Sequence, residues 1–420
     1  MANHARIAIQ LLIVLCVAHL TVDVLATTTV SLLPSMEEHL GLEKGGFLIG
    51  YIIWRVADSC GQMCFGYLGD RMRFKAIIWA GPLFSLFCFS FIGYVNSPVG
   101  MTLLLMCGGM GVAAFHPEAA TTAGNLSPKN RNRWLAMFAL SGYLGQAVGP
   151  AYGGSISDWF GLRGLTNNFY WCLPALMVVG ICLHWLSSKQ EHALQQPGAS
   201  EEREPDRSHR PAPVSQMILL FVGGVFRVMP ALGIPIVMSY ILISESDAIK
   251  GTVASYFMAG LGIGGIACAF GVGSKRQRLT LWLPALLTSL PVAMIGYSSI
   301  EPWFHLFGKL PVAELFVLAL ISGILQGVAM PIFISYAQQI MPAGQRFASS
   351  LTMGVTWGTG TLVFYGAMAF FNWLDYLQGI FWFFAAGCIV CAICSYLLRP
   401  ISDYALATGT EDDSIVPSTK

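Results

Sequence analysis

The chain has 420 residues, of which 55% are hydrophobic and only 11% are charged, and its mean hydropathy is +0.63. A soluble protein carries about 25% charged residues, so this composition excludes an ordinary soluble enzyme or binding domain. The formal net charge of +1 gives no indication of a nucleic-acid partner. Apolar runs long enough to cross a bilayer recur from end to end, which predicts a helical membrane protein with many spans.

Twelve spans can be drawn along the chain. We predict them at roughly 7–33, 45–66, 76–95, 101–124, 134–157, 169–187, 214–243, 251–272, 279–299, 313–338, 347–371 and 379–398. The first run is too long for a signal-peptide core and lacks a clear small-residue cleavage site, so we expect it to be retained as a helix. The eleven cysteines all fall inside these spans, where they are expected to pack as small apolar residues.

The distribution of positive charge indicates the orientation of the chain. Of the 23 Lys and Arg residues, 17 fall in segments assigned to the side of the N-terminus and 4 on the opposite side. Only Arg55 and Arg227 lie inside spans. Because cytoplasmic loops carry an excess of Lys and Arg, both termini are predicted to be cytoplasmic. We expect a bacterial inner (plasma) membrane protein in contact with the lipid bilayer.

A polar insert divides the chain into six spans and six spans. It is charged, contains proline and is poor in large apolar residues, so it is expected to be flexible. We therefore predict an N-terminal six-helix bundle at 1–188, a cytoplasmic linker at 189–213, a C-terminal six-helix bundle at 214–400 and an acidic, disordered cytoplasmic tail at 401–420. The segments after the second and eighth spans, 66–75 and 271–278, both place a glycine before a charged cluster, as a duplicated six-helix unit would.

The segment 66–75, GYLGDRMRFK, resembles the signature loop of the major facilitator superfamily, G-x-L-x-D-R-x-G-R-K, and departs from it only at Arg73-Phe74. The resemblance implies a fold of two pseudo-symmetric six-helix bundles. It also implies a cytoplasmic latch in which Asp70 binds a helix end of the other bundle while Arg71 and Arg73 form nearby ion pairs. The corresponding loop of the C-terminal half has Lys275 where an aspartate is expected.

The fifth span contains GQAVGPAYGG, which matches the antiporter motif G-x-x-x-G-P-x-x-G-G of this superfamily's exporters. Glycines spaced by four allow helices to approach closely, and a proline bends a helix. The motif comprises Gly145, Gly149, Pro150, Gly153 and Gly154, and the resemblance favours export by antiport over uptake.

Ionisable residues inside the spans are candidate functional residues, because each costs roughly 2.5–3.5 kcal/mol at the bilayer centre. In the fourth span, His116 and Glu118 flank a proline that leaves the carbonyl of Ala113 without its helical donor. In the first span, His19 and Asp23 share one helix face at i and i+4.

The fosmidomycin-resistance-protein branch of the superfamily has a similar pattern, carried by HLTVD at 19–23, FHPEA at 115–119, Arg227 and residues 338–360. The resemblance implies that spans 1, 4, 7 and 10 line a central cavity and bring these groups towards one site. Asp23 and Glu118 would then carry coupling protons, with His19 and His116 tuning their proton affinity. The residues expected to face substrate are Arg227, Gln338, Gln326, Tyr143 and Trp357, and the arginine favours an anionic compound.

The leading interpretation is a proton-coupled antiporter, expected to act as a monomer, that exports a small organic compound by alternating access. A divalent metal-ion exporter using His19, Asp23, His116 and Glu118 as ligands is an alternative, and a proton-coupled uptake symporter is another. An enzyme is not expected, since neither a His-Glu-x-x-His nor a Gly-x-Ser-x-Gly motif is present. No resident metal or cofactor is predicted.

Overall fold

The structure is a computed structural model that describes residues 2–72, 77–126, 131–194, 214–271, 276–298, 311–341, 348 and 351–400. Within these ranges the regular structure is helical. The long helices of the first half are α1 (Ala2–Thr27), α3 (Leu48–Met72), α4 (Ile77–Ser90), α5 (Pro98–Asn125), α6 (Arg131–Phe160) and α7 (Asn168–Leu194). Those of the second half are α8 (Val214–Ile241), α9 (Asp247–Gly271), α10 (Gln277–Ser298), α11 (Pro311–Ile340), α13 (Thr356–Trp373) and α14 (Ile380–Tyr396).

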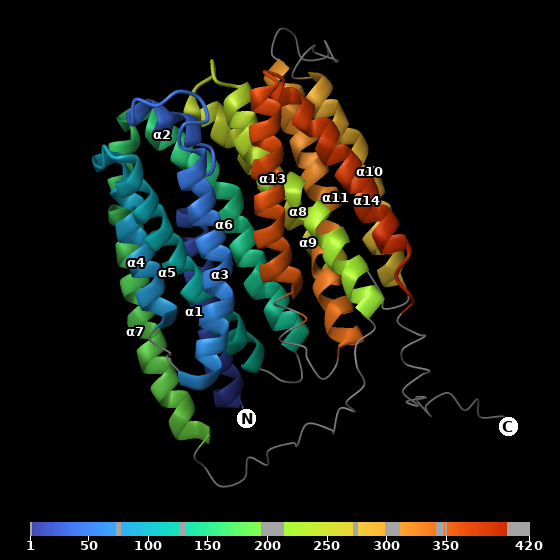
Figure 1. Cartoon of the computed structure of the whole chain (residues 1–420). Coiled ribbons are helices and arrows are strands. Elements are labelled where there is room, and N and C mark those ends of the chain that lie inside the picture. The colour runs from blue at the N-terminus through green and yellow to red at the C-terminus, as the bar shows by residue number, and fades with distance from the viewer. Residues whose placement is uncertain are drawn as a thin grey trace, which may run out of the picture.

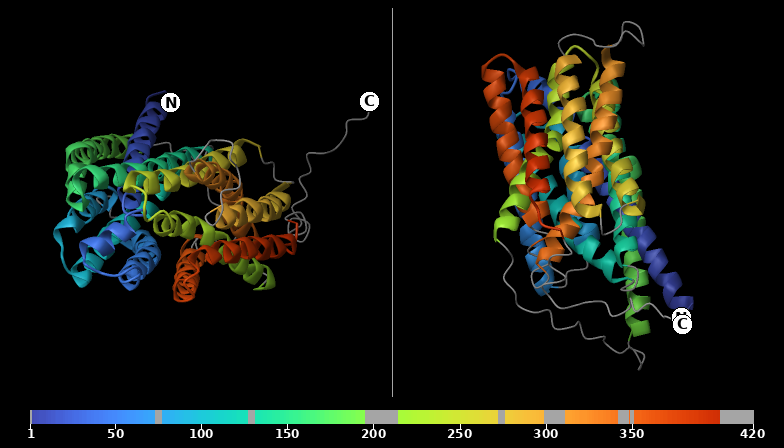
Figure 2. Two further views of the ribbon diagram at one scale, coloured as in Figure 1. Left: turned by 90° about the horizontal axis from the view of Figure 1, so that it is seen from above. Right: turned by 90° about the vertical axis from the view of Figure 1, so that its right-hand side faces the viewer.

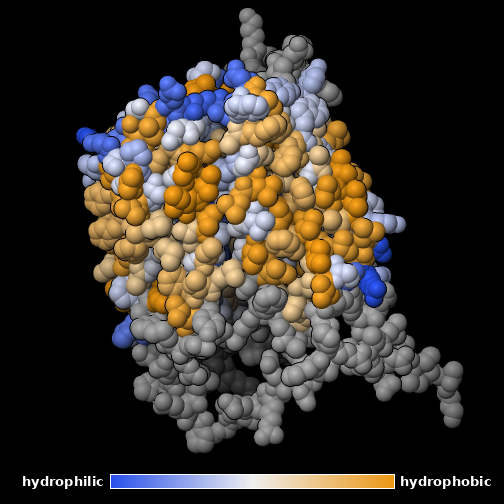
Figure 3. Space-filling view, viewed as in Figure 1, coloured by the Kyte–Doolittle hydropathy of each residue, from blue (hydrophilic) through white to orange (hydrophobic). Residues whose placement is uncertain are grey.

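The long helices run side by side, with the first-half helices on one side and the second-half helices on the other (Figure 1 and Figure 2). Helix α1 begins and α14 ends at the same end of the molecule (Figure 1). Figure 3 shows a broad hydrophobic band around the middle of the visible face, with hydrophilic residues gathered at the end opposite the start of α1. Exposed Ile, Leu, Val and Phe side chains belong on such a belt because they face lipid rather than water.

Nine helices in the described part of the chain are long and apolar enough to cross a membrane. The long helices outside that group are α3, α6 and α13, which carry more charged, glycine or hydroxyl residues. All three make contacts between the halves, since α3 packs against α13 and α6 packs against α9. Their lower hydropathy therefore follows from facing another helix rather than lipid.

The first helix ends earlier than its apolar sequence suggests. The predicted span reached residue 33, whereas α1 ends at Thr27 and a turn leads into the short helix α2 (Leu33–His39). The side chains of Thr27 and Thr28 bond back to carbonyl groups of α1, and Pro34 lies in the first turn of α2, where its missing N–H costs nothing. The predicted span at 347–371 likewise contains a π-helical turn, η7 (Leu351–Val355), before α13 begins.

Close contact between α6 and α1 depends on three glycines. A Cβ atom added at Gly145 or Gly149 would come within 3.0 Å of the backbone of α1, and one added at Gly153 would overlap the carbonyl group of Thr28, the residue that follows α1. The next glycine, Gly154, faces α9 instead, where a Cβ would overlap the carbonyl group of Asp247. The repeated glycines thus let α6 lie directly against one helix of its own half and one helix of the other.

Candidate functional site

The first helix positions two ionisable groups against α6. His19 and Asp23 are both buried, and His19 Nε2 lies 3.5 Å from Asp23 Oδ2. The His19 ring stacks on Phe138 at a centroid distance of 4.1 Å, and its Nδ1 lies 2.8 Å from the Phe138 carbonyl oxygen. The stacking contact and the hydrogen bond together fix the orientation of the His19 imidazole.

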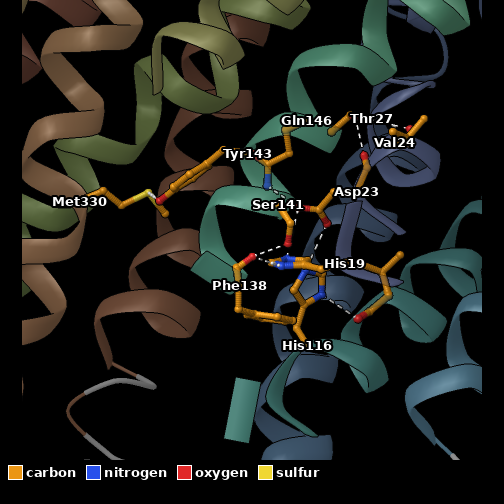
Figure 4. Close-up of polar contacts among 11 residues, drawn as sticks. His19, Asp23, Val24, Thr27, His116, Phe138, Ser141, Tyr143, Gln146 and Met330 are labelled. Atoms are coloured by element: carbon orange, nitrogen blue, oxygen red, sulfur yellow. Dashed lines mark hydrogen bonds and ion pairs between the residues drawn. The ribbon is translucent and has the colours of Figure 1, made fainter. Parts of the chain in front are cut away.

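The fourth predicted span, α5, brings a second histidine to the same carboxylate. His116 Nε2 lies 3.2 Å from Asp23 Oδ1, and His116 Nδ1 lies 2.9 Å from the Val112 carbonyl oxygen (Figure 4). The side chain of His116 is 25% exposed while that of Asp23 is 4% exposed. His116 is thus the member of the cluster that solvent reaches most readily.

Two residues of α6 complete the surroundings of Asp23. The Gln146 amide nitrogen donates to Asp23 Oδ2 at 2.9 Å. Gly142 faces the cluster so closely that a Cβ there would overlap the His19 ring and lie 2.8 Å from Asp23 Oδ2. Neither residue was a candidate from sequence, although Gln146 is an amide inside the antiporter motif.

The hydrogen bonds of the two histidines determine which of their ring nitrogens carry protons, and no positive charge then faces Asp23 if both rings are neutral. A carbonyl oxygen only accepts, so Nδ1 of both His19 and His116 must carry a proton. In neutral imidazoles, both Nε2 atoms then present lone pairs to the oxygens of Asp23. A carboxylate and two lone pairs facing one another are repulsive, so the arrangement calls for one or two added protons, or a metal cation. We refer to His19, Asp23 and His116 as the α1–α5 cluster.

Glu118 is not part of the α1–α5 cluster. It lies two residues beyond His116 on α5 and is half-buried. Residues two apart on an α-helix point about 200° apart around its axis, so His116 and Glu118 face opposite sides. The Glu118 side chain therefore leaves α5 in a different direction from that of His116, and its role as a second proton carrier stays a prediction.

A second ionisable pair on α3 lies near His116. Arg55 Nη1 is 3.6 Å from Asp58 Oδ2, and the Arg55 guanidinium lies over the Trp54 ring at 5.4 Å. Asp58 is buried and close enough to His116 for their charges to interact. The two residues are three positions apart on α3, which places both side chains on one face of the helix.

The residues expected to face substrate are distributed over α6, α8, α11 and α13. Tyr143 points away from Asp23 and donates to Met330 Sδ at 3.1 Å on α11 (Figure 4), so it reaches from α6 into the second half. Trp357 packs against the apolar core, and Gln338 is half-buried on α11. Arg227 and Gln326 line a separate small cavity and make no described contact with His19, Asp23 or His116.

The expected latch lies largely outside the described part. Arg73 is not among the described residues, and the side chains of Asp70 and Arg71 at the end of α3 are also outside them. The motif residues of α6, by contrast, are described. Gly145, Gly149 and Gly153 face α1, Gly154 faces α9, and a Cβ at Gly251 of α9 would overlap the Pro150 carbonyl.

Polar contacts join the halves at the end of the bundle away from the start of α1. Asp158 at the end of α6 accepts from the amides of Asp247 and Ala248, at 2.7 and 2.9 Å. Asp247 Oδ2 accepts in turn from Ser35 and Ser157. Asp158 therefore caps the first turn of α9 across the junction between the halves.

The α1–α5 cluster also has the composition of a cation site. One ligand atom from each of its three residues lies within 4.8 Å of the others, and two imidazole nitrogens with a carboxylate oxygen suit a divalent first-row metal. The Gln146 amide presents its nitrogen to Asp23, so it orients the carboxylate rather than adding a ligand.

Comparison with known proteins identifies the family of this architecture. The family described as Major Facilitator Superfamily matches residues 15–364. The chain is 23% identical to the fosmidomycin resistance protein of Escherichia coli (strain K12), over 85% of each chain. It is 22% identical to a Bacillus subtilis (strain 168) protein titled uncharacterized MFS-type transporter YfnC, over 86% of this chain and 85% of the relative. The crystal structure of a D-xylose-proton symporter superposes with a TM-score of 0.69 at 15% identity, over 94% of this chain and 98% of that one.

Proposed function

The chain belongs to the Major Facilitator Superfamily and is a secondary transporter of a small molecule, and from that premise we propose that it is a proton-coupled antiporter that exports a small organic compound. The observation that carries this proposal is the α1–α5 cluster. Its carboxylate faces the Nε2 atoms of two histidines whose Nδ1 atoms are already protonated. Such an arrangement gains stability from each proton that it takes up.

The position of the cluster suggests how proton binding is coupled to movement. Asp23 and His19 lie on α1, and α1 lies against the same helix, α6, that contacts α9 of the other half. A change of charge at Asp23 therefore acts next to the helix on which the halves meet. His116 is the more exposed group, so we propose that protons enter and leave through His116 and reside between it and Asp23.

The direction of transport is inferred from two features. The antiporter motif on α6 is complete, and one relative is a resistance protein. We propose on that basis that entering protons drive export, with the termini of the chain in the cytoplasm. Tyr143, Trp357 and Gln338 are the proposed contacts of the compound, and the loop with Asp70, Arg71 and Arg73 is the proposed cytoplasmic latch.

An efflux assay tests this proposal. The chain is expressed in a bacterial host that lacks its major drug exporters, and accumulation of a panel of organic compounds is compared with that of an empty-vector strain. At least one compound should accumulate less with the wild type, and a protonophore should abolish the difference. Asp23→Asn should abolish it as well, whereas Asp375→Asn, the same change in an exposed turn, should not. Equal efflux by Asp23→Asn and wild type would refute proton coupling at this site.

Export of a divalent metal ion is the second candidate, and the spacing of the three ligand atoms favours it. It predicts that the wild type raises tolerance to one of Mn, Fe, Co, Ni or Zn salts and that His116→Ala removes this tolerance. It also predicts unchanged accumulation of every organic compound. A tolerance to organic compounds that depends on Asp23, with unchanged metal tolerance, would exclude it.

A further inference from the structure

At the end of the bundle away from the start of α1, here called the far end, a carboxylate of the second half is held by the first half (Figure 1). Asp247 at the start of α9 accepts from the Ser35 hydroxyl on α2 at 2.6 Å and from the Ser157 hydroxyl on α6 at 2.7 Å. Asp158 on α6 accepts from the backbone amides of Asp247 and Ala248. We call Asp247, Ser35, Ser157 and Asp158 the Asp247 latch, because each of these hydrogen bonds joins the two halves.

Helices α6 and α9 also touch through their backbones next to the latch. A Cβ added at Gly154 would overlap the Asp247 carbonyl, and one added at Gly251 would overlap the Pro150 carbonyl. The halves of transporters with such repeats move largely as rigid bodies during alternating access. Opening of the far end therefore has to break the hydrogen bonds of the Asp247 latch.

Helices α3 and α13, which also meet across the halves, enclose two tyrosine hydroxyls at their contact. Tyr51 on α3 and Tyr365 on α13 are 0% and 2% exposed, and their ring centroids are 6.0 Å apart. Each hydroxyl is fully enclosed, and neither has a hydrogen-bond partner among the residues that the structure describes. A buried hydroxyl that has lost its bonds to water destabilises the state in which it is buried. We call Tyr51 and Tyr365 the tyrosine pair.

The Asp247 latch and the tyrosine pair act on one equilibrium in opposite directions. Opening breaks the hydrogen bonds of the latch, whereas it lets water reach the two tyrosine hydroxyls. We propose that the two features together form the gate of the far end, in which the latch stabilises the closed state and the tyrosine pair stabilises the open state. Because the two contributions offset each other, the closed and open states stay close in free energy, as a gate that alternates requires.

Distances between spin labels across the far end test this inference. The amino acid p-acetylphenylalanine replaces Tyr170 on α7 and Trp373 on α13, which are 83% and 78% exposed, and a nitroxide is attached to its ketone, so the native cysteines stay in place. Pulsed electron–electron double resonance on the purified full-length protein in lipid nanodiscs, at one pH and without substrate, measures the open and closed populations. The ratio of open to closed should rise about tenfold in Asp247→Ala.

The tyrosine pair is tested in the opposite direction. Adding Tyr365→Phe to Asp247→Ala removes a hydroxyl that gains a partner only in the open state, so the ratio should fall about tenfold, back towards the wild type. Adding Tyr94→Phe instead changes an exposed tyrosine of the same end and should leave the ratio as it was.

A second variant covers the case in which Asp247→Ala does not fold. Ser35→Ala removes one donor of the latch, so the ratio should rise about threefold, and Tyr365→Phe is then added to this variant. The inference would be overturned by a ratio that does not rise in Asp247→Ala or Ser35→Ala, or by a ratio that Tyr365→Phe does not lower. Neither substrate nor a proton gradient is present, so this outcome is independent of the efflux assay and of the proposed proton coupling.

Discussion

At the scale of single residues, the Asp23 carboxylate is held by side chains from three helices, namely His19 on α1, His116 on α5 and Gln146 on α6. The i, i+4 spacing of His19 and Asp23 placed them on one face, and the structure puts their side chains 3.5 Å apart. The approach of His116 depends on how α5 packs against α1, which spacing within one helix does not encode. Gln146 and Gly142 were missed for the same reason, because their role lies in contacts between helices.

Gly142 offers a sharp test of the cluster's geometry. In Gly142→Ala the new methyl group would displace the His19 ring or the Asp23 carboxylate, so the export rate per molecule should fall roughly tenfold, the effect of about 1.4 kcal/mol. Gly366→Ala is the matched control, since no atom lies within 4 Å of its added Cβ. Initial efflux rates, normalised to the amount of protein in the membrane, make the comparison. Equal rates for both variants would show that the packing around the cluster is not needed.

Glu37 lies in α2, outside the membrane spans, and its environment leads us to expect that the stability of the protein depends on pH. Its carboxylate accepts from the amides of Gly45 and Phe47, yet burial raises its pKa above the ordinary glutamate value. The folded state then holds the proton more tightly than the unfolded state. The free energy of unfolding should therefore fall as pH rises from the ordinary pKa through the folded pKa, by about 1.4 kcal/mol per unit of difference.

Unfolding of the purified protein across a pH series measures this effect. In Glu37→Gln the side chain no longer titrates, so the difference in unfolding free energy between variant and wild type should change with pH in that window. A difference that is constant with pH would mean that the carboxyl of Glu37 has the same proton affinity in both states.

At the scale of helices, the apolar runs predicted where the long helices lie. They predicted the residues at which these helices end less accurately. The run that begins α1 continues to residue 33, but the helix ends at Thr27 because threonine hydroxyls and Pro34 favour a turn there. The π-helical turn at 351–355 was also not predicted, since hydropathy carries no information on hydrogen-bond register. The glycine motif of α6, in contrast, predicted close helix packing, and Gly145, Gly149 and Gly153 do lie directly against the backbone of α1 or of Thr28, the next residue.

The contact between α6 and α1 predicts that Gly153→Ala is destabilising. Its Cβ would overlap the Thr28 carbonyl, and overpacking of this kind costs about 1–3 kcal/mol. Gly180→Ala is a suitable comparison, because the nearest atom to its Cβ is 3.7 Å away. Thermal unfolding in detergent should show a clearly lower Tm for Gly153→Ala alone. Similar Tm values for both would mean that α6 and α1 are not held as closely as described.

At the scale of the whole molecule, the family and its all-helical fold were predicted from sequence and confirmed. The composition was sufficient to predict a helical membrane protein. The loop at 66–75 was sufficient to predict the superfamily. The polar contacts between the halves were not predicted, because Asp158 and Asp247 are separated by 89 positions and lie outside the quoted motifs. The position of Arg227 on α8, away from the α1–α5 cluster, likewise depends on the packing of whole helices.

Asp158 joins the two halves by capping α9, so its replacement should loosen the start of that helix. Asp158→Ala removes both acceptors from the first turn of α9, so backbone hydrogen exchange at Asp247 and Ala248 should become several-fold faster, as expected for loss of a cap worth about 1 kcal/mol. Exchange in the middle of α14 serves as the control and should not change. If exchange at the start of α9 is unaltered, Asp158 does not hold the halves together.

The most direct test of the central claim is the proton flux that accompanies transport in proteoliposomes. A compound exported in the efflux assay is placed inside the vesicles, and a pH-sensitive dye reports protons that enter as the compound leaves. Wild-type protein should couple the two fluxes, and Asp23→Asn should lose the compound-dependent proton entry while Asp375→Asn keeps it. Compound-dependent proton entry at the wild-type rate in Asp23→Asn would contradict the role assigned to the α1–α5 cluster.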